Sequence, residues 1–555
     1  MRKGLLWAAG GLAAASAIGM TPASAAPPSV DAGAVAAQVD QRRDWQPAPA
    51  ADDVHVETHQ PQGTDADVRV RIDEIVFTGL ADGVTAESLA PVVAPFLHQE
   101  QTAGGLWDIA ARVTEELHRR GYLAAVAVLP VQTVDAHRLT IEVVLGRYGR
   151  IDIENGSDLR TGRAAAFAHR LAPGAVIEEQ LLDRTLRILN GLGGVRAQAY
   201  LSPGEAAGMS DVLLKLDCTE RQSGAVYVDD YGSHYTGRWR TGFSYTRDNP
   251  AHAGDTLLVH FLHGAGDGLD SYDVRYEIPV GRDGVTAGVA CYRTDYDLMR
   301  QYSKYDAYGM ADGWRVFARA PLVRSAAQDV DVLAELGTQR TADRVDAFDV
   351  DAEKHDETLR VGMDATWRTT RSAASLELVH TFGRLRWDNA YARSGAEANG
   401  TAAHFQKTTF DAYGITRLSP VWTLHATLSA QAAWNNLDSS ERFYIGGYHA
   451  VRAFPQGEAG GDTGVLGSLE LRAPLGRGWQ AAAFYDAGWV RYVHSPVADG
   501  DNARTLAGAG LGLIYQGAKH LYARLDYAAP LSDRWSESMG RQNHGMWWFQ
   551  FVDRF

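Results

Sequence analysis

From Gln222 to the C-terminal Phe555, the chain is a succession of segments in which apolar and polar side chains alternate. Successive side chains of a β-strand point to opposite faces, so this alternation predicts strands with one apolar and one polar face. We count sixteen such segments and find no convincing helix among them. The segments are 222–231, 237–247, 254–264, 270–280, 285–296, 306–321, 328–340, 357–370, 373–386, 405–418, 422–435, 463–475, 479–492, 504–516, 521–531 and 545–555.

The connections between these segments alternate in length. Tight turns such as 281–284, 371–372 and 476–478 follow even-numbered segments. Longer loops follow odd-numbered segments, at 341–356, 387–404, 436–462 and 532–544. Outer-membrane barrels have short periplasmic turns and long external loops. The pattern predicts a mainly β fold, a 16-stranded antiparallel transmembrane β-barrel over residues 222–555, with its sixth external loop at 436–462.

The two faces of the segments differ in charge. Tyr272, Val274 and Tyr276 share one face of a segment whose other face carries Asp273 and Arg275. Such strands suit a lipid-facing wall around a wet lumen. The 14 Trp and 23 Tyr fit this interpretation, because amphipathic rings gather where an apolar band meets water. A soluble β-sandwich would also alternate, but with fewer aromatic residues and shorter strands.

The N-terminal region has a different composition. Residues 1–25 combine Arg2 and Lys3 with an apolar run and a final Ala-Ser-Ala, the pattern of a cleaved secretory signal peptide. Residues 26–67 contain a stretch at helical spacing, 29–43, followed by a proline-containing linker. We predict one short helix, which must dock on another part of the protein or stay mobile.

Two small α/β modules are predicted between this helix and the barrel. Residues 68–149 follow the order strand, helix, helix, strand, strand, and residues 150–221 repeat that order more loosely. Tandem copies of one module are the economical interpretation. The alternative is a single larger α+β domain.

Composition argues against several functions. The net charge is −15, with scattered Lys and Arg, so a nucleic-acid partner has no electrostatic support. Cys218 and Cys291 fall in different predicted domains, and we interpret both as unpaired. His260 and His263 lie on opposite faces of a strand, which argues against a shared metal. We find no nucleophile-elbow or metalloprotease motif, and we predict no enzymatic activity, no cofactor and no metal site.

The stretch 442–464 contains six glycines among its 23 residues, together with Arg452 and several aromatic side chains. Such a composition is unusual for a solvated loop, and the nearest cavity of a barrel is its lumen. We predict that the loop folds inside the barrel, where Gly508, Gly510 and Gly512 make room for it on one strand face. The alternative is a disordered glycine-rich surface loop.

Asp486 belongs to the predicted strand 479–492. The residues flanking it, Tyr485 and Ala487, belong to the apolar face of their segment, so the carboxylate should point into the lumen. An inward carboxylate can accept a bidentate bond from a guanidinium that reaches it from the loop.

Together these features resemble the two-partner secretion transporters of the haemolysin and filamentous-haemagglutinin type, which join POTRA domains to a sixteen-stranded barrel. The resemblance rests on RRGYLAAVAVLPVQ at 119–132, VDDYGSHYTGRWRTG at 228–242, VRAF at 451–454 and FYDAG at 484–488. Ala453 departs from the family, which usually has glycine there. The resemblance implies that residues 68–149 and 150–221 are POTRA domains and that the N-terminal helix plugs the lumen.

The resemblance also assigns roles to individual residues. Those expected to anchor the loop or act in transport are Val451, Arg452, Ala453, Phe454, Asp486 and Gly488. The resemblance implies that Arg452 pairs with Asp486 and holds the loop in place. On that hypothesis Asp486→Arg should impair secretion, and the Arg452→Asp/Asp486→Arg double variant should restore it. Phe555 is expected to be a targeting signal that the barrel-assembly machinery recognises.

The function implied is that of a transporter in the outer membrane of a Gram-negative bacterium. It would capture an unfolded partner protein in the periplasm through its POTRA domains and export it through the barrel. Expected partners are a large secreted adhesin, cytolysin or contact-dependent inhibitor, outer-membrane lipid and lipopolysaccharide, and the barrel-assembly machinery. The alternatives are an insertase that assembles other outer-membrane proteins and a diffusion porin.

Overall fold

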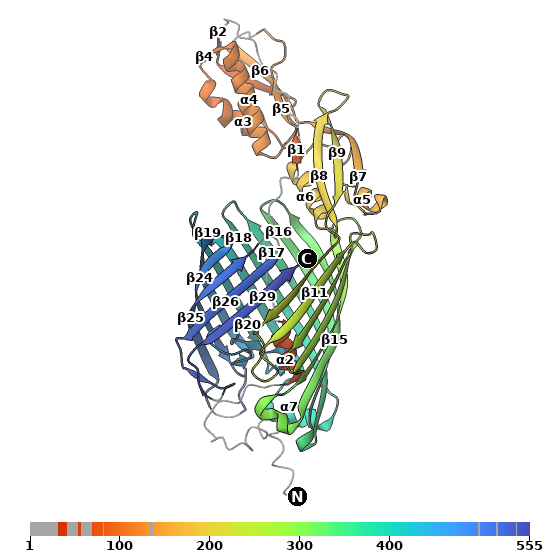
Figure 1. The fold of residues 1–555 in the computed structure, drawn as a ribbon. Helices are drawn as coiled ribbons and strands as arrows, with labels where there is room; N and C mark the ends of the chain where they lie inside the picture. The colour runs from red at the N-terminus through yellow and green to blue at the C-terminus, as the bar shows by residue number, and fades with distance from the viewer. Residues whose placement is uncertain are drawn as a thin grey trace.

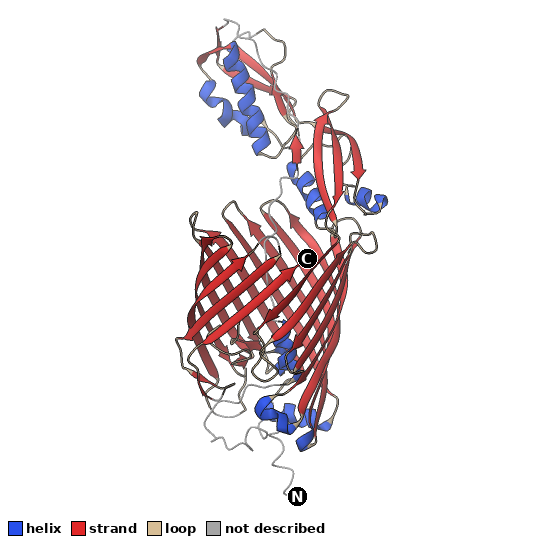
Figure 2. Cartoon of the chain, viewed as in Figure 1, coloured by secondary structure: helices blue, strands red, loops and turns tan. Residues whose placement is uncertain are grey.

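The computed structural model describes residues 31–40, 54–56, 69–81, 83–133, 137–497, 500–517, 520–539 and 541–555. Figure 1 shows a barrel with two small α/β modules beyond one end and the longer loops at the other. Figure 2 places helices in these modules, inside the barrel and at the loop end. The predicted signal peptide and most of the predicted linker lie outside the described residues. No helix in the described ranges is long and apolar enough to cross a membrane.

Sixteen antiparallel strands close the barrel, which confirms the predicted fold class. Each strand pairs with its neighbour in the chain, and the first strand pairs with the last. The strands are β10 Gln222–Asp229, β11 Arg240–Asp248, β12 Thr256–Gly264, β13 Leu269–Val280, β14 Val285–Asp297, β15 Ala307–Arg324, β16 Gln328–Val345, β17 Val350–Arg368, β18 Ser372–Trp387, β19 His404–Arg417, β20 Thr423–Ala433, β23 Thr463–Gly476, β24 Trp479–Arg491, β25 Ala503–Gln516, β26 Leu521–Pro530 and β29 Met546–Arg554.

Two predicted loops of the barrel are partly regular structure, so the prediction of loop there was wrong. The loop predicted at 341–356 is mostly the extension of β16 and β17, joined by a short 3-10 turn. Cross-strand ion pairs hold this extension, with Arg340 3.0 Å from Glu353 and Arg344 3.5 Å from Asp351.

The loop predicted at 387–404 contains a helix, α7 Ala390–Asn399, although no helix was predicted after Gln222. Asn389 caps it by accepting a hydrogen bond from Ala392 N, and Gly400 ends it with a φ of 63°. These are the residue types that favour the start and the end of a helix.

The two faces of each barrel strand differ as the alternation predicts. In β29 the Trp547 side chain faces outward and is 56% exposed, whereas Trp548 faces the lumen and is 1% exposed. In β24 the exposed Tyr485 and Trp489 alternate with the buried Phe484 and Asp486. Large apolar side chains on the outer surface suit contact with lipid.

Each N-terminal module has its own hydrophobic core. The first comprises β2 Arg69–Ile72, β3 Glu74–Thr78, α3 Ala86–Val93, β4 Gln99–Thr102, α4 Ala103–Arg119, β5 Val126–Val128 and β6 Arg138–Val144. The second comprises β7 Arg147–Asn155, α5 Thr161–Phe167, α6 Glu179–Asn190, β8 Val195–Pro203 and β9 Met209–Cys218. In both, amphipathic helices bury one apolar face against a small sheet.

The second module lies against the barrel rim. Arg163 donates to the carbonyl of Pro279 at 2.7 Å, and Arg170 pairs with Asp283 at 2.8 Å. Both acceptors belong to the end of β13 or to the short turn after it. The pKa of Asp283 is lowered, chiefly by the hydrogen bond from Arg170. These contacts fix the module at the end of the barrel that carries the tight turns.

The short strand β1 Val54–Val56 pairs in parallel with β8 of the second module. The sheet order is β1-β8-β9-β7, so the chain's own N-terminal segment covers the β8 edge. In the first module the order is β3-β6-β5, and β5 stands at an edge.

The helix α2 Ala32–Asp40 lies inside the barrel, within the stretch predicted to be helical (Figure 1). Asp31 caps it by accepting from Ala34 N at 2.8 Å. Asp343 of β16 accepts a second bond from Ala32 N at 2.7 Å. Ala32 and Val35 pack against barrel side chains from β12 to β15, namely Leu262, Leu269, Tyr296 and Ala311.

Candidate functional site

The long connection between β20 and β23 folds back into the lumen. It contains a 3-10 turn, η5 Ser439–Glu441, and the short strands β21 Phe443–Tyr444 and β22 Gly460–Gly461, which pair with each other. The side chains of Val451, Ala453 and Phe454 are fully buried. This is the loop predicted at 436–462, and it occupies the place predicted for it.

Arg452 reaches from this loop to Asp486 on β24. Its Nε and Nη2 donate to the two carboxylate oxygens of Asp486, each at 2.8 Å, and its backbone N–H donates to the same group at 3.2 Å. A planar guanidinium meeting a carboxylate in this way forms a charge-assisted bidentate pair. Asp486 is 0% exposed and Arg452 6% exposed, so water screens their attraction little.

Arg452 has further partners on the barrel wall. Nη1 donates to Glu470 at 2.6 Å and to Asp526 at 3.4 Å, and Nη2 donates to Ser468 at 3.1 Å. The guanidinium carbon lies 3.4 Å from the centre of the Phe484 ring, in a cation–π arrangement. One loop side chain therefore contacts strands β23, β24 and β26.

Together, Arg452 and the charged side chains around it on the barrel wall include equal numbers of positive and negative groups. Arg524 pairs with Glu470 at 2.7 Å and with Asp526 at 2.8 Å. Arg472 pairs with Glu470 at 2.6 Å. Three guanidinium groups thus meet three carboxylates, so the buried cluster has no net charge. Breaking such a cluster by removing one member is costly, because it leaves an uncompensated buried charge.

Small residues let the loop approach the wall. A Cβ added to Gly508 of β25 would overlap the Cβ of Ala453, and one added to Gly488 of β24 would lie 3.0 Å from the Cβ of Ile445. Ala453 is not among the described residues with positive φ, so alanine is unstrained where the resembling family has glycine.

A second carboxylate, Glu458, fixes the returning half of the loop. It is fully buried and pairs with Arg504 at 2.9 Å. It also accepts from the backbone N–H groups of Glu537 at 2.7 Å and Ser538 at 3.1 Å, and from the hydroxyl of Ser536 at 2.9 Å. Residues 536–538 of the last external loop therefore hold the returning half of the sixth loop.

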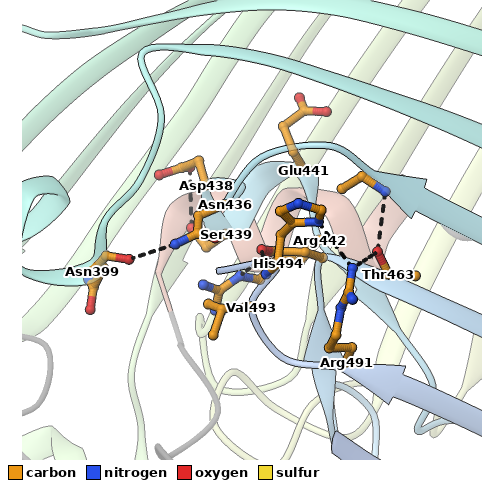
Figure 3. A network of polar contacts seen from close by, with 12 residues as sticks. Asn399, Asn436, Asp438, Ser439, Glu441, Arg442, Thr463, Arg491, Val493 and His494 are labelled. Atoms are coloured by element: carbon orange, nitrogen blue, oxygen red, sulfur yellow. Dashed lines mark hydrogen bonds and ion pairs between the residues drawn. The ribbon is translucent and has the colours of Figure 1, made fainter. Parts of the chain in front are cut away.

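A third set of contacts lies at the base of the loop (Figure 3). Asn436 donates to the carbonyl of Asn399 at 3.4 Å, which joins the loop to the end of α7. Arg491 donates to His494 at 3.0 Å and contacts Thr463 at 3.5 Å. These contacts fix the two chain segments from which the loop departs.

The loop also bridges the closure of the barrel between its first and last strands. Trp548 of β29 donates from its indole to the carbonyl of Arg452 at 2.6 Å. Tyr448 stacks on Tyr231, which follows β10, with ring centres 3.6 Å apart. β10 and β29 pair over five residues, compared with eight in each flanking pairing. The loop thus reinforces the shortest of these three ladders through one backbone carbonyl and one side chain.

The loop and α2 contact each other inside the lumen. A Cβ added to Gly33 of α2 would lie 2.8 Å from the Cβ of Ser440. A Cβ added to Gly457 of the loop would lie 2.7 Å from the side-chain amide of Gln38. These two close approaches need glycine, and they make the helix and the loop one packed unit.

The structure brings together all the residues predicted for the loop motif and its strand motif. Phe555 lies elsewhere, at the periplasmic end, where its backbone N–H donates to Gly224 at 3.0 Å and its ring lies over Phe243. Sequence reasoning missed Glu470, Arg524, Glu458 and Trp548, although alternation along the segment 521–531 places Arg524 and Asp526 on one strand face. Within the described ranges, no group of three His, Cys, Asp or Glu residues could hold a metal ion.

Comparison with known proteins gives a family match over more than half of the chain. The family described as haemolysin secretion/activation protein ShlB/FhaC/HecB matches residues 208–515, and the POTRA domain of ShlB type matches residues 70–146. The heme/hemopexin transporter protein HuxB of Haemophilus influenzae strain 86-028NP is 24% identical over 486 residues, which cover 85% of each chain. The outer membrane transporter CdiB of Escherichia coli is 26% identical over 464 residues, 80% of this chain and 76% of CdiB.

Solved structures agree with this fold. CdiB from Escherichia coli superposes with a TM-score of 0.70 at 21% identity, covering 95% of this chain and 96% of CdiB. BamA from Haemophilus ducreyi lacking POTRA domains 1–3 superposes with a TM-score of 0.54 at 16% identity, covering 88% of this chain and all of that one.

Proposed function

This chain belongs to the haemolysin secretion/activation family of ShlB, FhaC and HecB, and we propose how its lumen controls the export of a partner protein. Members of the family are outer-membrane transporters whose POTRA domains face the periplasm. The observation that carries the proposal is the double obstruction of the lumen, by α2 and by the loop that Arg452 pins to Asp486. Both α2 and the sixth loop belong to the chain itself, and both must move out of the lumen before a polypeptide can pass.

We propose that Arg452, with Val451, Ala453 and Phe454, keeps the loop seated against β24, where Gly488 leaves room for it. The neutral cluster of three arginines and three carboxylates supports this role, because the seated loop satisfies charges that would otherwise be buried alone. Phe555 is proposed to address the barrel to the barrel-assembly machinery.

Client capture is proposed to use a strand edge of the POTRA modules. Unpaired N–H and C=O groups at an edge add an extended segment with little demand on its sequence. β5 stands at an edge of the first module, whereas β1 already occupies the β8 edge of the second. A client strand would add to β5 directly and would compete with β1 for β8.

The partner is proposed to be a large secreted protein of the adhesin, cytolysin or contact-dependent inhibitor class. The names of the relatives support this range, because one is described as a heme/hemopexin transporter and the other as CdiB. The exposed aromatic side chains of the outer wall are proposed to contact outer-membrane lipid and lipopolysaccharide. We propose no enzymatic activity for the chain and no cofactor. The likeness to BamA concerns the fold, so the insertase alternative has no observation of its own in its favour.

Secretion itself tests the proposal. The full-length chain is expressed with a large candidate partner from the neighbouring gene, in a host without such systems, and the partner is measured in the medium. The amount of exported partner should fall when residues 69–218 are removed and when Arg452 is replaced by alanine. If the barrel inserts correctly and does not export the protein of the neighbouring gene, but alters the assembly of other outer-membrane proteins, the result would support the insertase instead.

A further inference from the structure

A cationic cavity of about 350 Å³ opens among the loops at the end of the barrel opposite the POTRA modules. Four parts of the chain line it: the first external loop, the third external loop, the sixth loop, and Met539 together with residues 541–548. Five of its lining side chains are basic or can become so, namely His234, Arg238, Arg300, Arg541 and His544. Among the residues that the structure describes, no Asp or Glu lines it. The cavity therefore presents donors and positive charge without a matching carboxylate.

The charges of this cavity are only partly compensated. Arg238 pairs with Asp230 at 2.7 Å outside the cavity lining. Arg300 and Arg541 are exposed, and neither forms an ion pair within the described ranges. Burial, together with the charges of Arg300, Arg541 and Arg238, lowers the pKa of His234 below its ordinary value. The three guanidinium groups are thus close enough to oppose protonation of one imidazole, and a bound anion would offset their part of the shift.

The position of the cavity indicates what kind of anion it meets. Trp547 both lines the cavity and belongs to the outer face of β29, where it is exposed. Trp239, immediately before β11, is also exposed, and its ring centre lies 6.1 Å from that of Phe549. Exposed aromatic rings of this kind mark the level where the apolar band of a barrel meets the polar headgroups.

We propose that this cavity binds a phosphate group of a glycolipid of the outer leaflet, with Arg300 and Arg541 as its principal ligands. Guanidinium groups match phosphate oxygens in geometry and charge, and the neighbouring tryptophans face the sugar and acyl part of the same lipid. The floor of the cavity includes Pro455 and Gln456 of the sixth loop. A bound headgroup would therefore touch the loop that closes the lumen.

The test uses the full-length protein in nanodiscs of phosphatidylcholine with added bisphosphoryl lipid A, and native mass spectrometry counts the bound lipid A. The Arg300→Ser/Arg541→Ser variant should bind lipid A at least about tenfold more weakly, because two charge-assisted contacts are lost. The matched control is Arg393→Ser/Arg534→Ser, which removes the same charge from exposed residues of α7 and of the last loop outside the cavity. Lipid A without phosphates should bind the unmodified chain as weakly as the cavity variant binds the phosphorylated form.

Three results would overturn the proposal. Equal losses in the cavity variant and the control would mean diffuse attraction rather than a site. Equal binding of lipid A with and without phosphates would remove the phosphate from recognition. Displacement of lipid A by a hexaglutamate peptide or by inorganic phosphate at similar concentrations would assign the cavity to an acidic polypeptide or to a free anion.

Discussion

Replacing Arg452 by alanine should release the sixth loop from the barrel wall while leaving the strands in place. In the seated state Asp486 would lose its guanidinium partner and keep only Ser468, whose hydroxyl lies 2.7 Å away, and the backbone N–H of the substituted residue. Glu470 would keep Arg472 and Arg524. The cost therefore falls mainly on one buried carboxylate, which regains water once the loop leaves.

The size of this effect follows from the burial of the pair. Removing one partner of a buried ion pair costs about 3–5 kcal/mol. The closed-to-open ratio of the loop should then fall by roughly two to three and a half orders of magnitude, since about 1.4 kcal/mol corresponds to a factor of ten. Arg472→Ala is the matched control. It removes a charge from the same cluster, but Arg472 lies on β23 and Glu470 would keep two guanidinium partners.

Loop opening can be measured as the maleimide labelling rate of Ala450→Cys, which is buried in the seated loop. The exposed Cys218 and Cys291 are first replaced by serine. Arg452→Ala should raise the rate about a hundredfold or more, and Arg472→Ala should leave it within a few-fold. Rates within threefold of the parent chain in Arg452→Ala would refute the reasoning.

The remaining predictions concern other contacts of the loop and one POTRA helix. Gly508→Val should clash with Ala453 and unseat the loop, so the same cysteine should label faster, whereas unchanged labelling would contradict the close approach. Glu458→Gln should weaken the contacts of the sixth loop with Arg504 and with the last external loop. A protease added to intact cells should then cleave the last external loop faster than in the parent chain, and equal cleavage rates would argue against this anchor. The charge reversal Arg452→Asp/Asp486→Arg should not restore secretion, because the new carboxylate would face two others at the wall; full restoration would show that the pair acts alone. Hydrogen bonds from two neighbouring arginines lower the pKa of Glu116 to about 2, so this group stabilises α4 above about pH 4.5 and loses that effect as the pH falls toward 2. Hydrogen exchange of α4 in Glu116→Gln should exceed that of the parent at pH 7 and match it near pH 2; a difference that persists at pH 2 would exclude this cause.

The charge-reversal prediction shows where sequence reasoning stopped. Alternation along each strand fixes which side chains face the lumen, and it placed Asp486 there correctly. It does not fix the position of each residue along the barrel axis, because that position depends on the register of sixteen strands around the barrel. Glu470 and Asp526 lie on different strands, yet the stagger brings both within reach of Arg452. The pair was predictable from the resemblance, whereas the cluster required the closed barrel.

The external loops show a second limit of the same kind. The β16–β17 extension carries charges on both faces, so the apolar alternation used to find strands ends before the strands do. Cross-strand ion pairs hold it instead. The signal for α7 was local, an Asn389 cap and a Gly400 end around an alanine-rich stretch, and it could have been found in the sequence.

The N-terminal segment touches the transporter at two distant places, since α2 lies in the lumen and β1 lies on the second POTRA module. Residues 41–53 join them, a contour length of roughly 45 Å. If α2 were to leave the lumen while β1 stayed paired, the covalent connection alone would keep it within that length of β1. Its return would then be a first-order event, independent of how many transporters the membrane holds.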